Sequence, residues 1–382
     1  MTKPAPGISA LVVILLFVSS LQAQTPDNAM ALERQGKLPE AVEAWRAVTA
    51  RNPKDAAAFA SLGVALSKEQ KCSEAALAYR KALALNPKLP GIELNLGLAE
   101  FKQGHFPAAI LPLRAALAAD PSSTQARTLL GMSYYGAKKF ALAAQYLQPV
   151  ADSDPENMAL HQTLAQSCLA AKKYDCALAE FRRIVERNPD SAAAHVLTGE
   201  ALDGLSRTGE AIAEFEAAVK ISPREPNLHF GLGYLYWKSH QYSEAKQEFD
   251  KELSLYPNDG QSLAYLGDMA WKDDHPDQAL SFFQQALKAN NQLRIVYIDL
   301  GAIYMRQKKY ENAKTALHRA IALDPTQSDA HYQLGRLYQA LGNKAEADKE
   351  LAKVRALHEK ADASLQEKMP STPPPPLNPS NQ

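Results

Sequence analysis

The sequence predicts an all-α solenoid built from about ten helix-turn-helix repeats of 34 residues. In each repeat, apolar residues follow the three- and four-residue spacing of amphipathic helices in two runs, which indicates two helices per repeat. Prolines mark the period at intervals of 34 residues, or of twice 34 across Asn291: Pro53, Pro87, Pro121, Pro155, Pro189, Pro223, Pro257 and Pro325. A single fixed period is the signature of a repeat array.

Three further columns appear when the proline is counted as position 32 and the repeats begin near residues 22, 56, 90, 124, 158, 192, 226, 260, 294 and 328. Position 20 is alanine in every repeat: Ala41, Ala75, Ala109, Ala143, Ala177, Ala211, Ala245, Ala279, Ala313 and Ala347. Position 8 is Gly63, Gly97, Gly131, Gly199, Gly233, Gly267, Gly301 and Gly335, with Ala29 and Ala165 in the other two repeats. Position 24 is always large and apolar: Trp45, Tyr79, Leu113, Leu147, Phe181, Phe215, Phe249, Phe283, Leu317 and Leu351. We expect close backbone approach at position 8, a core side chain at position 24, and a proline that ends the second helix.

These columns closely resemble the tetratricopeptide repeat (TPR) family, over residues 22–361. The resemblance implies a right-handed superhelix whose concave groove binds extended peptides or helices. It also implies that positions 2, 5, 9, 12 and 13 of the first helix line that groove.

The first residues predict export. Lys3 precedes an apolar run at residues 8–21, and Ala23 is a small residue at which cleavage can occur. A run of 14 residues is short for a membrane span, which takes about 20. We therefore expect residues 1–23 to be a cleaved signal peptide and the mature chain to be periplasmic or secreted, with no transmembrane span. The alternative is an uncleaved segment that anchors the chain.

The array departs from a regular solenoid in two places. Pro112 and Pro149 lie inside second helices, where each removes a hydrogen bond, so we expect a local change of curvature. In the last repeat, position 32 is Glu359, and helical character continues to about Met369. This predicts an extended, charged capping helix. The solenoid is then expected to span residues 24–369, followed by a disordered Pro-rich tail at 370–382.

A second apolar stripe on the first helices is the candidate binding site. It occupies positions 5, 9 and 12, beside basic residues at position 13, and we call it the first-helix stripe. Its members are Leu94, Leu98, Phe101, Lys102, Met132, Tyr135, Phe230, Tyr234, Trp237, Lys238, Trp271, Lys272, Ile298, Met305 and Arg306. Exposed aromatic and apolar side chains commonly mark interaction sites. The alternative is that these side chains pack on one another or form ordinary core between repeats.

The three cysteines are too few for a disulfide framework. Cys168 and Cys176 fall on the two expected helices of one repeat, so they either form a disulfide or remain two small buried side chains. Cys72 has no evident partner.

Several other functions are disfavoured. Basic and acidic residues number 42 each, so no net charge attracts nucleic acid. Four histidines share position 4, but equivalent residues of stacked repeats lie about 10 Å apart, too far to share one metal ion. No catalytic or cofactor-binding motif is evident, so we expect neither enzymatic activity nor a cofactor.

The sequence therefore predicts an exported scaffold that binds a protein or peptide partner in its groove, in envelope assembly, secretion or polymer export. Two alternatives remain at this point: a chiefly structural, self-associating array, and an enzyme of undetected type.

Overall fold

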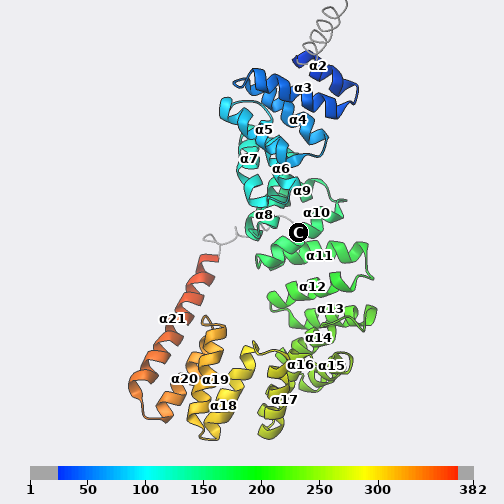
Figure 1. The fold of residues 1–382 in the computed structure, drawn as a ribbon. Helices are drawn as coiled ribbons and strands as arrows, with labels where there is room; N and C mark the ends of the chain where they lie inside the picture. Colours follow the sequence, from blue (N-terminus) through cyan, green and yellow to red (C-terminus); the bar gives the residue numbers. More distant parts are fainter. Residues whose placement is uncertain (1–24, 369–382) are drawn as a thin grey trace, which may run out of the picture. The chain divides into compact units, whose positions relative to one another are not determined.

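The computed structural model describes residues 25–368, and these form twenty α-helices, α2 to α21, without a strand (Figure 1). The predicted all-α class is confirmed. The expected signal peptide, residues 1–23, and the Pro-rich tail, residues 370–382, lie outside the described residues.

The described chain divides into two parts, which we treat separately. The N-terminal part comprises residues 25–190 and 200–206, and the C-terminal part comprises residues 191–199 and 207–368. Helices of the N-terminal part are α2 (Pro26–Arg34), α3 (Leu38–Arg51), α4 (Ala56–Lys68), α5 (Cys72–Leu85), α6 (Ile92–Lys102), α7 (Phe106–Ala119), α8 (Thr124–Gly136), α9 (Phe140–Ser153), α10 (Met158–Ala170) and α11 (Tyr174–Arg187). Helix α12 (Ala192–Gly204) contributes to both parts. The C-terminal part continues with α13 (Thr208–Ile221), α14 (Leu228–Lys238), α15 (Tyr242–Leu255), α16 (Gly260–Lys272), α17 (Pro276–Ala289), α18 (Arg294–Arg306), α19 (Tyr310–Leu323), α20 (Ser328–Ala340) and α21 (Lys344–Lys368).

Each repeat is a helix hairpin, and its turn has the same geometry throughout. The residue at position 15 has a positive φ, between 56° and 73°, in all ten repeats: Gly36, Gln70, Gly104, Lys138, Lys172, Ser206, His240, Asp274, Lys308 and Gly342. In nine of these repeats, the following amide donates to a carbonyl five residues earlier, as in Lys139 N to Tyr134 O at 2.8 Å. This left-handed closure satisfies the last carbonyls of the first helix.

The two helices of a hairpin meet at positions 8 and 24. A Cβ atom added to Gly267 would lie 2.4 Å from Phe283 Cε1, and one added to Gly97 would lie 2.4 Å from Leu113 Cγ. Phe283 and Leu113 both stand at position 24, and both side chains are fully buried. The close approach expected at position 8 is therefore made chiefly by the position 24 side chain, which lies directly on the glycine.

The second helices end where the prolines predict. In repeat 2, α5 stops at Leu85 and Asn86 caps it, directly before Pro87. Pro112 and Pro149 lie inside α7 and α9, which continue through them, so the expected change of curvature stays a prediction. The extended last helix is confirmed, because α21 has 25 residues where other second helices have 14.

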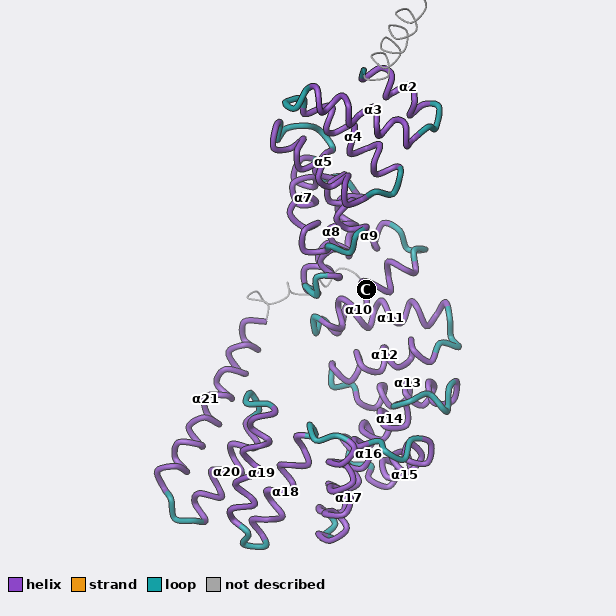
Figure 2. The backbone as a smooth tube through the Cα atoms, in the orientation of Figure 1, coloured by secondary structure: helices purple, strands orange, loops and turns teal. Residues whose placement is uncertain are grey.

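Within each part, a second helix packs against the first helix of the next repeat, as α7 does on α8 and α17 on α18 (Figure 2). First helices also contact each other, as α14 does with α16 and α16 with α18. Side chains of consecutive first helices therefore meet along one face of each part.

A substitution at position 20 tests the packing inside a hairpin. Ala211 is fully buried on α13, so we expect Ala211→Leu to lower the free energy of unfolding by about 1 to 3 kcal/mol through overpacking. Urea unfolding followed by circular dichroism measures the change. Ala213→Leu, on the exposed side of the same helix, is the control and is expected to change it by less than about 0.5 kcal/mol. Equal effects of the two substitutions would contradict this packing.

The turn geometry gives a second prediction. Lys138 has a φ of 56°, a conformation that costs an L-residue about 1 to 2 kcal/mol. Lys138→Gly removes this cost, but glycine also increases the conformational entropy of the unfolded chain, which offsets part of the gain. We therefore expect the free energy of unfolding to rise by about 0.5 to 1 kcal/mol. Lys139→Gly, next to it with a φ of −93°, is expected to lower stability in the same urea experiment. A loss of stability in both variants would refute the prediction.

Candidate functional site

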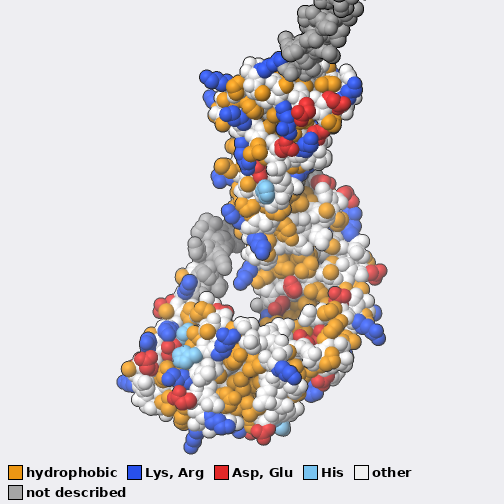
Figure 3. Space-filling model, viewed as in Figure 1, with side chains coloured by type: hydrophobic (Ala, Val, Ile, Leu, Met, Phe, Trp, Pro, Cys, Tyr) orange, Lys and Arg blue, Asp and Glu red, His pale blue; other side chains and the backbone are white. Residues whose placement is uncertain are grey.

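The first-helix stripe lies on α6, α8, α14, α16 and α18. Its apolar side chains are all half-buried, whereas its basic residues at position 13 are exposed. The stripe is thus neither a fully solvated helix face nor part of the closed core. Acidic and basic side chains are interspersed on the face drawn in Figure 3.

In repeats 4 and 7, position 12 is bonded to the following repeat. Tyr135 Oη donates to Gln166 Oε1 at 2.8 Å, and Trp237 Nε1 donates to Asp268 Oδ2 at 2.7 Å. Each acceptor is at position 9 of the next repeat. These two aromatic side chains therefore help to join neighbouring repeats.

A basic residue from the following repeat covers each of two tryptophans. Lys272 Nζ lies 4.5 Å from the centroid of Trp237 and 2.8 Å from Asp268 Oδ2. Arg306 lies over Trp271, with its Cζ atom 5.3 Å from the ring centroid, and also pairs with Asp274. The cation is attracted to the ring face and to the carboxylate at once. One face of each indole is therefore occupied by the chain itself.

An aromatic cluster forms where α14 meets α16, and Tyr265 is at its centre. The ring centroid of Tyr265 lies 4.9 Å from Trp237, 5.6 Å from Tyr234 and 5.9 Å from Phe230. The contacts with Trp237 and Tyr234 are edge-to-face, a favourable arrangement of ring quadrupoles. Burial, and then the neighbouring Tyr234, Asp268 and Asp299, raise the pKa of Tyr265, so its hydroxyl stays protonated at neutral pH.

Two carboxylates lie beside this cluster. Asp268 is buried and accepts hydrogen bonds from Trp237 and Lys272. Asp299 Oδ2, on α18, is buried without a hydrogen-bond partner. Burial, and then the charge of Asp268, raise the pKa of Asp299 well above its usual value, although Lys272 opposes this shift. The site therefore contains two different carboxyl groups. Asp268 accepts hydrogen bonds from two donors, whereas Asp299 resists ionisation.

The sequence interpretation missed two residues of this site. Tyr265 and Asp299 both stand at position 6, which was not counted as part of the stripe, whereas Asp268 stands at position 9. One signal was available in the sequence. An aromatic donor at position 12 is followed 31 residues later by a polar acceptor in both Tyr135 with Gln166 and Trp237 with Asp268.

The remaining stripe residues pack locally. Phe101 and Tyr135 make edge-to-face contacts with Phe106 and Phe140, at centroid distances of 5.6 Å and 5.8 Å. Leu94 packs on the core of α7 and α8, and Met305 packs on that of α19 and α20. Leu98, Met132 and Ile298 are half-buried on their helices. The stripe residues of repeats 7 to 9 therefore lie together in the C-terminal part. Those of repeats 3 and 4 form a separate group in the N-terminal part.

The histidines at position 4 have partners of their own. In four repeats the histidine Nδ1 lies 2.5 to 2.6 Å from a glutamate Oε2 at position 23: His161 with Glu180, His195 with Glu214, His229 with Glu248, and His331 with Glu350. Burial works against ionisation of Glu350, yet hydrogen bonds from Lys353 and His331 hold its pKa below the usual value. Among residues 25–368, no group of three or more His, Cys, Asp or Glu side chains could hold a metal ion.

Cys168 and Cys176 form a disulfide in this structure, with their Cα atoms 5.8 Å apart. It joins α10 to α11 within repeat 5. Cys72, at the start of α5, is a free thiol.

The buried carboxyl of Asp299 gives a pH-dependent prediction. The pKa of Asp299 is higher in the folded protein than in the unfolded chain, where it is near 3.9. The contribution of Asp299 to the free energy of unfolding is therefore highest below the unfolded pKa and falls as pH rises through the folded pKa. We expect Asp299→Asn to raise the free energy of unfolding at pH 7.5 by about 1 to 3 kcal/mol, with a smaller gain at pH 4.5.

Urea unfolding at the two pH values measures both gains. Asp348→Asn, at an exposed position of α21, is the control and is expected to have little effect at either pH. A gain for Asp299→Asn that does not depend on pH would contradict the raised pKa.

Family models described as tetratricopeptide repeat match this chain at residues 27–90, 94–157 and 163–226, at 226–259 and at 329–361. A model described as TPR repeat matches residues 301–342. The first of these models alone matches half of the chain.

One curated relative and two solved structures are similar to this chain. The type IV pilus assembly protein PilF of Pseudomonas aeruginosa is 35% identical over 69 residues, which are 18% of this chain and 27% of PilF. The chain thus spans about a quarter of the length of that relative. The crystal structure of the APC/C hetero-tetramer Cut9-Hcn1 aligns with 89% of this chain and 82% of its own, at 14% identity and a TM-score of 0.52. Yeast Tom70 aligns at 14% identity over 93% and 97% of the two chains, with a TM-score of 0.44. The repeats, the helix pairs and the matched models agree, and the chain belongs to the tetratricopeptide repeat family.

Proposed function

We propose that this chain is an exported scaffold that binds a partner polypeptide along the first-helix stripe, with repeats 7 to 9 as the principal site. The observation that carries the proposal is the aromatic cluster of Phe230, Tyr234, Trp237 and Tyr265. It lies on consecutive first helices, and its side chains are half-buried. The fold itself is that of a protein-interaction scaffold.

The cluster has the properties of a recognition site. Tyrosine and tryptophan dominate the binding energy of many interfaces because they bury a large area at a small cost in side-chain entropy. Here the bond from Trp237 to Asp268 fixes the indole before a partner arrives, which lowers the entropic cost of binding. The same bonds that join the repeats thus prepare the surface.

The surroundings of the cluster suit a mixed polar and apolar partner. Lys238, Lys272 and Arg306 are exposed along the edge of the stripe, one in each of repeats 7 to 9. Such an edge can pair with charged groups of the partner while the aromatic rings contact its apolar side chains. We assign no reaction, cofactor, metal or nucleic acid to this surface.

Two observations support export. The apolar segment at residues 8–21 is typical of a signal peptide. Cys168 and Cys176 are bridged, and structural disulfides persist chiefly in oxidising compartments. A periplasmic or secreted location is consistent with both. Within residues 25–368, no helix is long and apolar enough to cross a bilayer.

The local similarity to a pilus assembly protein favours a role in envelope assembly over secretion or polymer export. It covers too little of either chain to specify a partner. The proposal therefore extends to the class of partner, a polypeptide, and to the surface that binds it.

The role of Tyr234 can be tested by replacing it with a photo-crosslinking amino acid and identifying the captured protein. Binding of that purified partner to the Tyr234→Ala variant is then measured by calorimetry. We expect at least about 30-fold weaker binding, which corresponds to the loss of one interface hot spot of about 2 kcal/mol. Tyr234 is preferred to Trp237 because Trp237 also bonds to Asp268.

The matched control is Tyr242→Ala, a more exposed tyrosine on the second helix α15. It is expected to bind the partner with unchanged affinity. If Tyr234→Ala, with unaltered helicity, binds as tightly as the parent chain, the stripe is not the binding surface.

A further inference from the structure

The hairpins contain a recurring carboxylate site between their two helices. In repeat 7, His229 Nδ1 bonds to one oxygen of Glu248 at 2.6 Å, and Lys251 Nζ bonds to the other at 2.7 Å. Repeat 10 repeats the arrangement with His331 at 2.5 Å and Lys353 at 2.8 Å from Glu350. A carboxylate at position 23 is thus held between donors at positions 4 and 26.

Repeat 9 also has a basic residue at position 26, but it lacks both the carboxylate and the histidine. Position 4 is Tyr297 and position 26 is Arg319, whose Cζ lies 6.0 Å from the ring centroid of Tyr297. Position 23 is Ala316, which has no acidic group. No carboxylate of the described residues lies within ion-pair distance of the exposed Arg319.

A pocket is present at this position. It is lined by Tyr297, Leu300 and Tyr304 of α18 and by Asn312, Ala316 and Arg319 of α19, among others. Two tyrosine rings and a leucine offer apolar contact, while the guanidinium and the amide offer hydrogen-bond donors.

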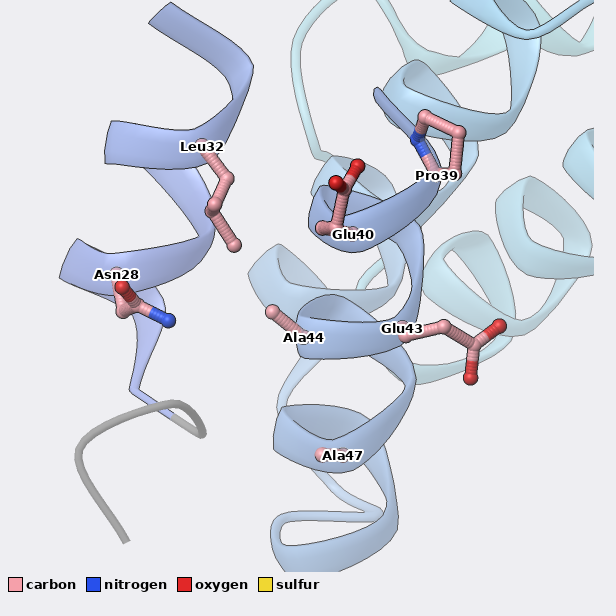
Figure 4. Close-up of a pocket in the computed structure, with 7 residues that line it drawn as sticks. All are labelled: Asn28, Leu32, Pro39, Glu40, Glu43, Ala44 and Ala47. Atoms are coloured by element: carbon pink, nitrogen blue, oxygen red, sulfur yellow. The ribbon is translucent and has the colours of Figure 1, made fainter. Parts of the chain in front are cut away.

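The equivalent pocket in repeat 1 shows what is particular to repeat 9. It lies between α2 and α3, where position 23 is also alanine, Ala44 (Figure 4). Its position 26 is Ala47, and its rim carries Glu40 and Glu43. An alanine at position 23 therefore accompanies a hollow in both hairpins, but only the pocket of repeat 9 is lined by an arginine and two tyrosines.

We propose that the pocket between α18 and α19 binds a carboxylate side chain, a glutamate of a partner polypeptide, in the place that Glu248 and Glu350 occupy in repeats 7 and 10. Arg319 pairs with the carboxylate through its planar fork of donors, and the stem of the glutamate lies against Ala316 and the tyrosine rings. This inference rests on the proposed binding of a polypeptide, but it concerns a surface separate from the stripe.

The test uses the mature chain and the peptide acetyl-Ala-Glu-Ala-amide, with saturation-transfer NMR to detect binding. We expect saturable binding that is at least tenfold weaker for Arg319→Gln and unchanged for Lys314→Gln, a basic residue of the same helix that does not line the pocket. The peptide acetyl-Ala-Gln-Ala-amide, which has no charge, is expected to bind at least tenfold more weakly than the glutamate peptide.

A second variant supplies the missing carboxylate from within the chain. Ala316→Glu places a carboxylate at position 23 beside Arg319, so we expect it to abolish binding of the glutamate peptide. Failure of the parent chain to bind the peptide would overturn the proposal, as would equal binding of the glutamine peptide or unchanged binding by Arg319→Gln. Equal affinity for free acetate would exclude a polypeptide as the source of the carboxylate.

The titration contains no natural partner, so its result is independent of the crosslinking experiment on Tyr234. If the crosslinking experiment excludes the stripe as a binding surface, binding of the glutamate peptide would still support the pocket between α18 and α19. A negative titration would leave the stripe proposal untouched.

Discussion

The contact between position 8 and position 24 is the constraint on which the rest of the structure depends. The side chain at position 24 lies where a Cβ at position 8 would be, as Phe283 does on Gly267. This contact sets the distance between the two helices of a hairpin. Once that distance is fixed, alanine at position 20 is buried in every repeat, and the first helices of each part present positions 5, 9 and 12 along one face of that part. Both proposed sites are consequences of this geometry.

Sequence columns predicted the fold well because the hairpin contacts are local and repeated. Positions 8, 20 and 24 lie within one repeat, and their residue types vary little from one repeat to the next. The turn at position 15 was less visible. Its backbone is left-handed in all ten repeats, yet only three of them have glycine there. Backbone geometry was thus conserved between repeats where residue type was not.

The proposed binding surface was harder to predict, because the exposure of a first-helix side chain depends on the following repeat. Trp237 stands at a position expected to face a partner, but its indole bonds to Asp268 and is covered by Lys272. The residue types at one repeat position, taken alone, contain no information about pairs of residues such as Trp237 and Asp268. The histidines show the same difficulty. Position 4 alone did not reveal their partner, although glutamate occurs at position 23 in the four repeats with that histidine and in no other.

The pairing of columns also explains how one scaffold can carry different sites. A hairpin needs its position 8 contact, but it does not need the polar group at position 23, which is glutamate, alanine, proline, tyrosine or phenylalanine in different repeats. A buried ion pair contributes little net stability, because the cost of desolvation offsets most of the attraction. Removal of the carboxylate together with a change of its histidine therefore costs the hairpin little and leaves a donor without its acceptor. In repeat 9 that donor is Arg319, and the hairpin that carries it keeps Gly301 at position 8 and Leu317 at position 24. The same fold can thus exchange an internal contact for a binding site one repeat at a time.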